Sequence, residues 1–246
     1  TNLNSHMMTN MEWGAIAYLT YSKYGRCTNE SCTEVTINNI NTGYYGKGAA
    51  FSGQWEYGTT ITGCAANTIS ESVVSNSSDC ANKYNTNKGY LASTTGNITG
   101  IYDMSGGSWE YVMGVLEDSN GNLYSRDSGF KGLKGNVAGA NTSGLDFPDK
   151  KYYDSYVSSD AVGTDNWYKY TSGKLGDATK EIANTKINSS NDRGLWFNDY
   201  ASFVSPASPF FERGGSWYDG AGAGVLHFYR DPGFSGHCSA RLMLAF

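Results

Sequence analysis

The chain has 246 residues, of which 17% are charged, and its formal net charge at pH 7 is −5. Glycine (31 residues) and tyrosine (19 residues) are abundant, which favours a loop-rich domain containing β-structure over a helical bundle. Lysine and arginine are scattered along the chain, which argues against a nucleic-acid partner. No stretch approaches the roughly 20 apolar residues of a membrane span. Because no internal repeat or linker is visible, residues 1–246 are predicted to form one domain.

The N-terminal segment predicts a helix followed by a strand. Apolar residues recur at helical spacing through residues 7–21. Asn4 or Ser5 could cap the start of this helix, and Gly25 is placed to end it. Residues 33–38 alternate in the manner of a short strand.

The middle of the chain is polar and rich in glycine. A second short helix is predicted over residues 78–85, and a turn followed by a strand over residues 100–115. Residues 117–172 read as ordered loop with a few short strands, a long irregular stretch that suggests a functional role. A third short helix is predicted over residues 175–184.

The C-terminal part is again apolar and aromatic. Residues 222–228 are predicted to form a strand entered through glycines, and residues 241–246 a closing strand.

The chain has five cysteines. Local pairing would give two disulfides, Cys27–Cys32 and Cys64–Cys80, and would imply an oxidising compartment. Four cysteines allow three pairings, and reduced cytosolic thiols are the alternative. Zinc binding is disfavoured because no Cys-x2-Cys pair exists. Cys238 is left over.

Three segments carry a family resemblance. Residues 100–111 read Gly-Ile-Tyr-Asp-Met-Ser-Gly-Gly-Ser-Trp-Glu-Tyr, residues 213–217 read Arg-Gly-Gly-Ser-Trp, and residues 240–244 read Ala-Arg-Leu-Met-Leu. In order and spacing they resemble the signatures Gly-Leu-Tyr-Asp-Met-x-Gly-Asn-Val-Trp-Glu-Trp, Arg-Gly-Gly-Ser-Trp and Gly-Phe-Arg-x-Val of the formylglycine-generating-enzyme (sulfatase-modifying factor) family. The resemblance implies an α+β, C-type-lectin-like fold that is loop-rich, with short twisted antiparallel sheets and a few helices.

Most residues of these segments read as scaffold. Glycine pairs allow tight turns, and large aromatic side chains supply buried area. Arg213 is expected to pair with a carboxylate such as Glu110 in a buried bidentate bridge. The predicted structural residues are Asp103, Trp109, Glu110, Arg213, Gly214, Gly215 and Arg241.

The resemblance does not extend to the copper site of those enzymes. They carry two cysteines after Arg-Gly-Gly-Ser, and the corresponding positions here are Asp219 and Gly224. A copper(I) site requires thiolates, so the sequence predicts no catalytic residues and no cofactor. The alternative is a metal-dependent oxidase in which His227, His237 and Asp231 form a two-histidine, one-carboxylate set.

Calcium is the one structural ion for which the sequence offers ligands. Residues 118–122 and 160–165 are rich in aspartate and could supply hard oxygen ligands. The same segments are also typical of ordinary turns.

Residues 216–240 have the composition of a binding surface, with aromatic residues among small polar ones. The segment also resembles the variable region of diversity-generating-retroelement target proteins, in which adenines of asparagine codons are randomised. Such codons cannot yield Lys, Glu, Gln, Met or Trp; the first four are absent from the segment, which does contain one tryptophan, Trp217. The predicted ligand-binding residues are Trp217, Tyr218, Asp219, His227, Tyr229, Arg230, Asp231, Phe234 and His237.

The sequence therefore predicts a non-catalytic ligand-binding domain that recognises a protein or a glycan through one shallow C-terminal face. Its expected location is extracellular or the surface of a bacterium or a phage virion, with an export signal or anchor upstream of Thr1. The alternatives are the metal-dependent oxidase and a structural pilus or fibre subunit. Metal analysis would distinguish the first, and solution size the second.

Overall fold

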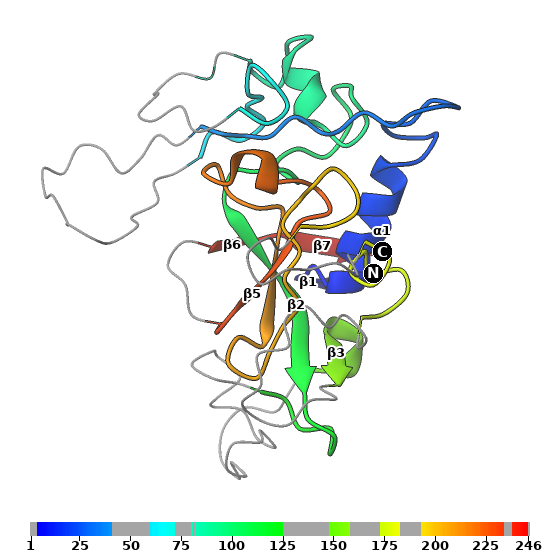
Figure 1. The fold of residues 1–246 in the computed structure, drawn as a ribbon, viewed down its shortest axis with the longest axis vertical. Helices are drawn as coiled ribbons and strands as arrows, with labels where there is room; N and C mark the ends of the chain where they lie inside the picture. The colour runs from blue at the N-terminus through cyan, green and yellow to red at the C-terminus, as the bar shows by residue number, and fades with distance from the viewer. Residues whose placement is uncertain are drawn as a thin grey trace, which may run out of the picture.

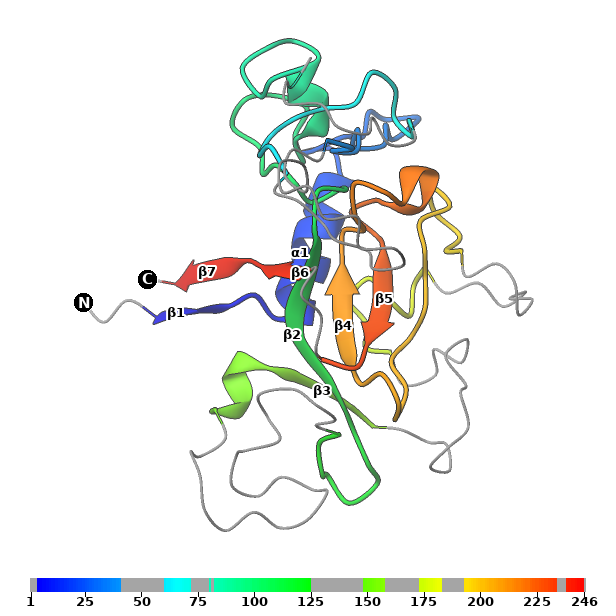
Figure 2. The ribbon, with the colours of Figure 1, turned by 90° about the vertical axis from the view of Figure 1, so that its left-hand side faces the viewer.

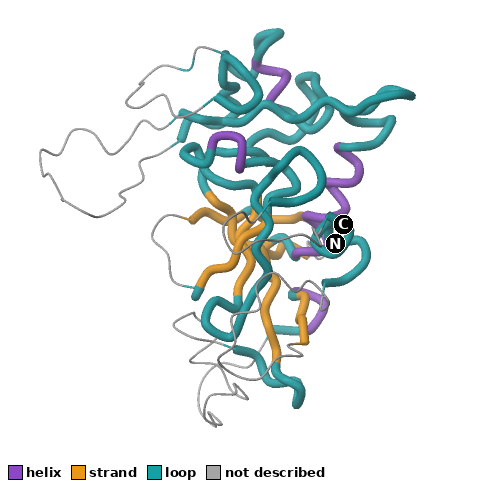
Figure 3. The backbone as a smooth tube through the Cα atoms, viewed as in Figure 1, coloured by secondary structure: helices purple, strands orange, loops and turns teal. Residues whose placement is uncertain are grey.

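Short strands joined by long loops organise the chain. The structure, a computed structural model, describes residues 4–40, 60–71, 80, 82–124, 148–157, 173–182, 193–233 and 238–245. Loops and turns make up most of the trace (Figure 3). The elements of the described residues are the helix α1 (Asn10–Thr20), the strands β1 (Asn4–Met7), β2 (Trp109–Glu117), β3 (Asp154–Val157), β4 (Phe210–Arg213), β5 (Phe228–Asp231), β6 (Cys238–Ala240) and β7 (Leu242–Ala245), and 3-10 turns at Gly89–Ala92, Lys150–Tyr152 and Gly220–Gly222. The described chain is thus a loop-rich α+β structure. Its loop-rich, β-containing character agrees with the prediction from composition, and the α+β class agrees with what the resemblance implies.

A mixed sheet lies at the centre of the molecule, with the long strand β2 running through it (Figure 1). β4 pairs with β2 in antiparallel orientation, and β5 pairs with β4 in the same way. β3 and β6 pair in parallel with successive halves of the opposite edge of β2. The strand predicted within residues 100–115 is confirmed as β2, although it continues to Glu117.

The two ends of the chain form a second, antiparallel ribbon. Asn4 lies opposite Ala245, and Met7 lies opposite Leu242. β1 and β7 project side by side from the body, with the termini at the outer end (Figure 2). The predicted closing strand is confirmed over Leu242–Ala245.

The helix α1 begins at a capping box. The hydroxyl of Thr9 accepts a hydrogen bond from the backbone of Glu12 at 3.2 Å, and the Glu12 carboxylate accepts from the backbone of Thr9 at 2.8 Å. The sequence-based prediction of a cap at Asn4 or Ser5 is wrong because both residues lie in β1, where they pair with the far end of the chain.

The helix is also shorter at its end than the sequence predicts. Its last residue is Thr20, and its cap is Tyr21. Gly25 lies in the turn that follows, with its N–H bonded to the carbonyl of Ser22 at 3.0 Å. The turn after the helix, and not Gly25 itself, therefore ends it.

α1 packs on the inner side of the central sheet. Trp13 of the helix, Phe211 of β4 and Phe228 of β5 are completely buried. The indole of Trp13 donates to the carbonyl of Val225 at 2.8 Å, and the ring of Tyr156 meets that of Phe211 edge-on with centroids 5.0 Å apart. Such edge-to-face aromatic contacts add to the free energy gained from apolar burial.

Residues 33–38 do not form the predicted strand. Their N–H groups at positions 36, 37 and 38 donate to the carbonyls of Leu91, Ile69 and Ser105. Because these partners come from three separate segments, no continuous ladder forms, and only a bridge between Asn38 and Gly106 remains. The segment serves as a connector between loops.

The helix predicted over residues 175–184 is absent from its described part, which folds as consecutive turns over 175–182. The carboxylate of Asp177 accepts hydrogen bonds from the backbone of Lys174 at 3.2 Å and of Thr179 at 2.8 Å. Side chain to backbone bonding of this kind competes with the helical pattern.

The strand predicted over residues 222–228 begins only at Phe228. The preceding loop is fixed by the buried side chain of Asp199, which accepts from the backbone of Leu226 at 3.0 Å. A Cβ atom at Gly224 would lie 2.0 Å from a carboxylate oxygen of Asp199. The glycine is therefore needed for close packing and does not mark the entry of a strand.

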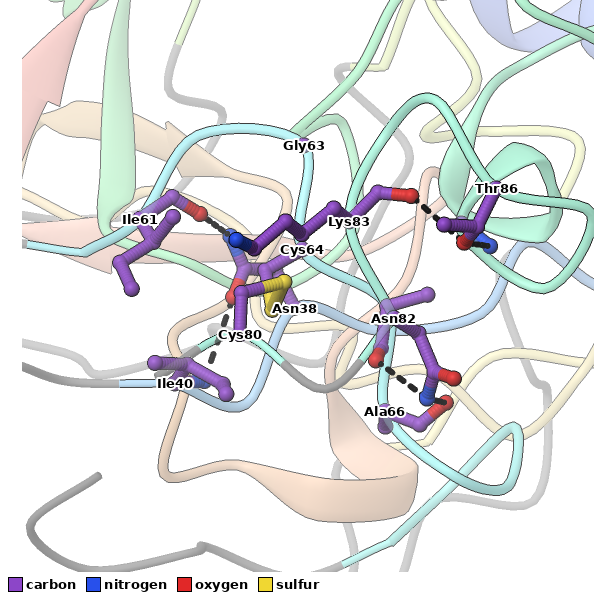
Figure 4. Close-up of a disulfide and its surroundings, with 12 residues drawn as sticks. Asn38, Ile40, Ile61, Gly63, Cys64, Ala66, Cys80, Asn82, Lys83 and Thr86 are labelled. Atoms are coloured by element: carbon purple, nitrogen blue, oxygen red, sulfur yellow. Dashed lines mark hydrogen bonds between the residues drawn. A yellow bond between two sulfur atoms is a disulfide. The ribbon is translucent and has the colours of Figure 1, made fainter. Parts of the chain in front are cut away.

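Both predicted disulfides are present. Cys27–Cys32 closes a tight loop, and Cys64–Cys80 joins segments whose Cα atoms are 5.7 Å apart at the bridge. Figure 4 shows the second bridge between Ile40 and a pair of antiparallel segments.

The antiparallel pair beside the second disulfide replaces a predicted helix. Ala65 donates from its backbone to the carbonyl of Asn82 at 3.0 Å, so residues 82–85 are not part of the helix predicted over 78–85. The amide of Asn82 returns a bond to the Ala65 carbonyl at 3.0 Å.

The two disulfides are compatible with an extracellular or secreted protein, since such bonds persist in oxidising compartments. Within the described part of the chain, no helix has the length and apolar character needed to cross a bilayer.

Candidate functional site

Two glycine turns interlock at one end of the central sheet. Gly106 and Gly107 lie within residues 100–111, just before β2, and Gly214 and Gly215 follow β4; all four have positive φ angles between 71° and 81°. The N–H of Gly106 donates to the carbonyl of Gly214 at 2.9 Å, and the N–H of Trp217 donates to the carbonyl of Gly107 at 2.7 Å. Only glycine adopts this conformation without strain, and a Cβ at Gly215 would lie 2.6 Å from Ala223. Two of the three segments that carry the family resemblance therefore contact each other directly.

The turn after Gly215 is held by one carboxylate. Asp219 accepts hydrogen bonds from the backbone of Ser216 at 2.7 Å, from the Ser216 hydroxyl at 3.1 Å and from the indole of Trp109 at 2.8 Å. This anchoring leaves Trp217 half-buried and Tyr218 47% exposed. Asp219 thus acts on the turn and ties it to β2.

The strand β5 separates its side chains onto two sides of the sheet. Phe228 faces the core, whereas Tyr229 is 38% exposed on the outer side. The register places Tyr111 opposite Glu212 and Glu212 opposite Tyr229. These three side chains consequently form a row across the outer side of β2, β4 and β5.

Asp231 and Cys238 complete this outer surface. The hydroxyl of Tyr111 donates to the carboxylate of Asp231, and the thiol of Cys238 donates to that of Glu212 at 2.6 Å. We call the surface formed by residues 217–219, Trp109, Tyr111, Glu212, Tyr229, Asp231 and Cys238 the outer face. On this face, side chains of β2 and β4 contact residues near both ends of the predicted binding segment: Trp109 donates to Asp219, and Cys238 donates to Glu212.

Glu212 is an unusual component of the outer face, because it is only 4% exposed. Burial raises the pKa of Glu212 to about 8, and the carboxylate of Asp231 raises it as well. At neutral pH Glu212 therefore holds a proton, which allows it to lie beside a second carboxylate without repulsion.

The prediction that His227 is an exposed contact residue is wrong. Its side chain is 1% exposed, and its Nδ1 is 2.8 Å from the carbonyl of Gly222. The imidazole packs below Tyr200 and Tyr229, with ring centroids 6.0 and 6.4 Å away. Burial lowers the pKa of His227, so the ring is neutral at pH 7.

Arg230 does not lie on the outer face. Because side chains alternate along a strand, Arg230 points to the side opposite Tyr229 and Asp231, and its guanidinium reaches the hydroxyl of Ser205 at 3.3 Å. The prediction of one shallow face that contains all of the candidate residues is therefore wrong for Arg230 and His227. Phe234 and His237 lie outside the described residues.

The predicted ion pair between Arg213 and Glu110 is also replaced. These residues lie opposite each other on β4 and β2, but Glu110 forms its bidentate bridge with Arg241, at 2.9 and 2.6 Å. Arg241 reaches Glu110 from the segment between β6 and β7. Arg213 is left fully buried between the rings of Trp13 and Phe228, at 5.8 and 5.7 Å.

Asp103 has a positive φ of 61° and organises the loop beside the disulfide Cys64–Cys80. Its carboxylate accepts from the backbone of Gly63 at 3.0 Å and from the amide of Asn38 at 2.9 Å. The contacts of Asp103, like those of Glu110 and Arg241, are internal to the scaffold.

The described residues contain no group of three or more His, Cys, Asp or Glu side chains arranged to hold a metal ion. Residues 118–122 form a turn, in which the Asp118 carboxylate accepts from the backbone of Asn120 at 2.8 Å and of Asn122 at 2.9 Å. Residues 160–165, the other calcium candidate, lie outside the described part of the chain.

A separate apolar groove of about 280 Å³ lies between α1 and residues 94–101. Leu19 and Tyr24 on its rim are 60% and 73% exposed. No charged side chain lines it. The groove is therefore the alternative docking surface to the outer face.

The sequence predicts a scaffold role for Trp109 and does not predict Glu212 or Tyr200 as part of a functional site. The alternation within residues 109–112 could have indicated that Trp109 and Tyr111 share a face. Tyr200, which stacks under the guanidinium of Arg193 at 3.8 Å and meets Tyr229, carries no local signal because its partners are distant in sequence.

The chain matches no family model and has no significant match among curated proteins.

Proposed function

We propose that the chain is a non-catalytic ligand-binding domain of a secreted or surface-displayed protein, and that it recognises a protein or a glycan through its outer face. One observation carries the proposal. Tyr218 and Tyr229 expose large aromatic rings on backbone that is fixed from below by hydrogen bonds and by buried glycine turns. Exposed tyrosines on a rigid support are the contacts that interface hot spots use, because little conformational entropy is lost on binding.

The polar groups of the outer face support the same function. Asp219 and Asp231 are oriented by the indole of Trp109 and the hydroxyl of Tyr111. A ligand would therefore meet carboxylates that are already in position, which lowers the cost of ordering them on binding.

We further propose that the fold is C-type-lectin-like, of the formylglycine-generating-enzyme type. The contact between the two glycine turns, the paired chain ends and the bridge from Arg241 to Glu110 support this assignment, since each involves a segment that carries the resemblance. Fold alone does not establish function, and the proposal of binding rests on the outer face.

The non-catalytic part of the proposal rests on residue identity. Asp219 and Gly224 stand at the positions of the copper-binding cysteines, Asp219 is engaged in the turn, and the space at Gly224 is filled by Asp199.

We propose that residues 216–240 are a diversified segment, because the framework glycines lie below the exposed side chains and would tolerate changes above them.

The proposal is tested by replacing the two exposed tyrosines together. The purified chain is applied to an array of glycans and to an array of purified bacterial surface proteins. We expect discrete binding by the parent chain and at least a tenfold loss of affinity for Tyr218→Ala/Tyr229→Ala, which corresponds to about 1.4 kcal/mol.

Tyr24→Ala is the matched control, since Tyr24 is equally aromatic and more exposed but lies on the groove beside α1. Retained binding by the double variant together with loss in Tyr24→Ala would move the site to that groove. Stoichiometric copper or iron in the purified chain would favour the oxidase alternative.

A further inference from the structure

The guanidinium of Arg193 is held in one orientation beside the outer face. It lies over the ring of Tyr200 at 3.8 Å, and its Nη1 donates to the carbonyls of Asn198 at 2.9 Å and Ala221 at 3.1 Å. Tyr200 in turn meets Tyr229 of the outer face edge-on, with ring centroids 6.5 Å apart. Stacking and the two carbonyl bonds remove most of the rotational freedom that an arginine side chain has at a surface.

The backbone around Arg193 is shaped to accommodate this stack. A Cβ atom at Gly222 would lie 2.2 Å from Cε2 of Tyr200 and 2.7 Å from Nη1 of Arg193, so only glycine fits. The turn that leads from Arg193 back to Tyr200 carries Phe197 at a φ of 56° and Asn198 at a φ of 64°. A positive φ is strained for a bulky residue such as phenylalanine, and such strain is found preferentially at functional sites. The strained turn is the segment that supplies the Asn198 carbonyl to Arg193.

Arg193 has no acidic partner among the described residues. It forms no ion pair with an aspartate or a glutamate there, and its Nε and Nη2 donate no hydrogen bond to the same part of the chain. The carboxyl group of Asp199, which precedes Tyr200, is fully buried, and burial raises its pKa well above the ordinary value. Such a carboxyl group is a poor counter-ion. The edge of the guanidinium formed by Nε and Nη2 is therefore available to a ligand.

An acceptor and an exposed ring lie close to the same turn. Asp219, two residues before Ala221, accepts three hydrogen bonds at Oδ2, from Ser216 N, Ser216 Oγ and the indole of Trp109, whereas Oδ1 has no hydrogen bond to the residues that the structure describes. Tyr218 beside it is 47% exposed. A ligand at this end of the outer face would therefore meet one cation, one oriented acceptor oxygen and exposed tyrosine rings.

We infer that Arg193 is a carboxylate-binding subsite of the outer face, and that the ligand is a glycan that carries a sugar acid. The inference rests on the proposed binding function, because the same ligand would cover Tyr229. The Nε–Nη2 edge can donate two parallel hydrogen bonds to a carboxylate, a charge-assisted pairing of high geometric specificity. A sugar acid carries this carboxylate on the same ring as hydroxyl donors for Asp219 and an apolar face for Tyr229. A protein ligand would need separate side chains for the three contacts, each ordered at its own entropic cost.

Esterification of the ligand tests the inference on the parent chain. The probes are arrayed oligosaccharides that contain uronic or nonulosonic acids, each paired with its methyl ester. We expect the parent chain to bind at least one of the acids and to lose about tenfold or more in affinity for the matching ester. Because no residue is changed, the result does not depend on the stability of a variant. Binding of none of the acids, or equal affinity for acid and ester, would overturn the inference.

Arg193→Gln keeps a hydrogen-bonding side chain but removes the charge. It should lower the affinity for the acid to that for the ester, and it should leave the affinity for the ester unchanged. Arg230→Gln is the matched control, because Arg230 points to the opposite side of β5 and reaches Ser205 at 3.3 Å, so that this variant should bind the acid as the parent chain does.

Parental affinity of Arg193→Gln for the acid would overturn the inference. If Tyr218→Ala/Tyr229→Ala still lost binding in that case, the proposed function would stand without the subsite. Retained binding by that double variant would instead remove the proposed function itself.

Discussion

The two sides of β5 differ in what their side chains do, whereas β4 is buried on both sides. On the core side, Phe211, Arg213 and Phe228 are completely buried beneath α1. On the outer side, Tyr229 is 38% exposed one residue away from Phe228. The alternation of side chains along β5 thus places a core residue, Phe228, directly beside an exposed residue, Tyr229.

Truncating neighbouring residues of β5 that point to opposite sides of the sheet should produce very different losses of stability. Phe228→Ala should lower the free energy of unfolding by about 3–5 kcal/mol, because it opens a cavity among Trp13, Phe211 and the sheet. Tyr229→Ala should change it by about 1 kcal/mol or less. Urea unfolding followed by tryptophan fluorescence measures both values. Equal losses would contradict the separation of the two sides.

Glu212 is a buried acid on the outer side of β4. Its pKa is raised from 4.5 to about 8, so the folded chain retains the proton over a range in which the unfolded chain releases it. Stability should therefore fall as the pH rises from about 4.5 to about 8. The shift corresponds to at most about 5 kcal/mol.

Glu212→Gln removes this titration and should flatten the pH dependence, so that the variant gains stability relative to the parent chain at pH 8. Unfolding curves at several pH values measure the difference. Glu30→Gln, at an exposed position, is the control and should leave the curve parallel to that of the parent. A parallel curve for Glu212→Gln would show that Glu212 is ionised in the folded chain.

The parts of the fold that the sequence predicts well are those with local causes. Cys27 and Cys32 are near neighbours, the apolar run after Arg241 needs only a partner strand, and the glycines before Trp109 and Trp217 predict tight turns. Each of these depends on a few consecutive residues.

The failures have distant causes. The predicted cap of α1 at Asn4 or Ser5 is wrong because both residues pair with β7, at the far end of the chain. Glu110 takes Arg241 as its partner although Arg213 lies opposite it in the sheet.

The same limit applies to the candidate site. The exposure of Tyr218 and Tyr229 agrees with their composition-based selection. The burial of His227 depends on Tyr200, and the direction of Arg230 depends on where β5 begins, which Asp199 controls from a separate segment. No pattern within residues 216–240 encodes these contacts.

Hydroxyl-radical footprinting of the chain with and without its array-identified ligand tests recognition through the outer face. We expect oxidation of Tyr218 and Tyr229 to fall on binding, whereas oxidation of Tyr24 and Leu19 at the groove should not change. Protection of Tyr24 and Leu19 with undiminished oxidation of Tyr218 and Tyr229 would contradict recognition through the outer face.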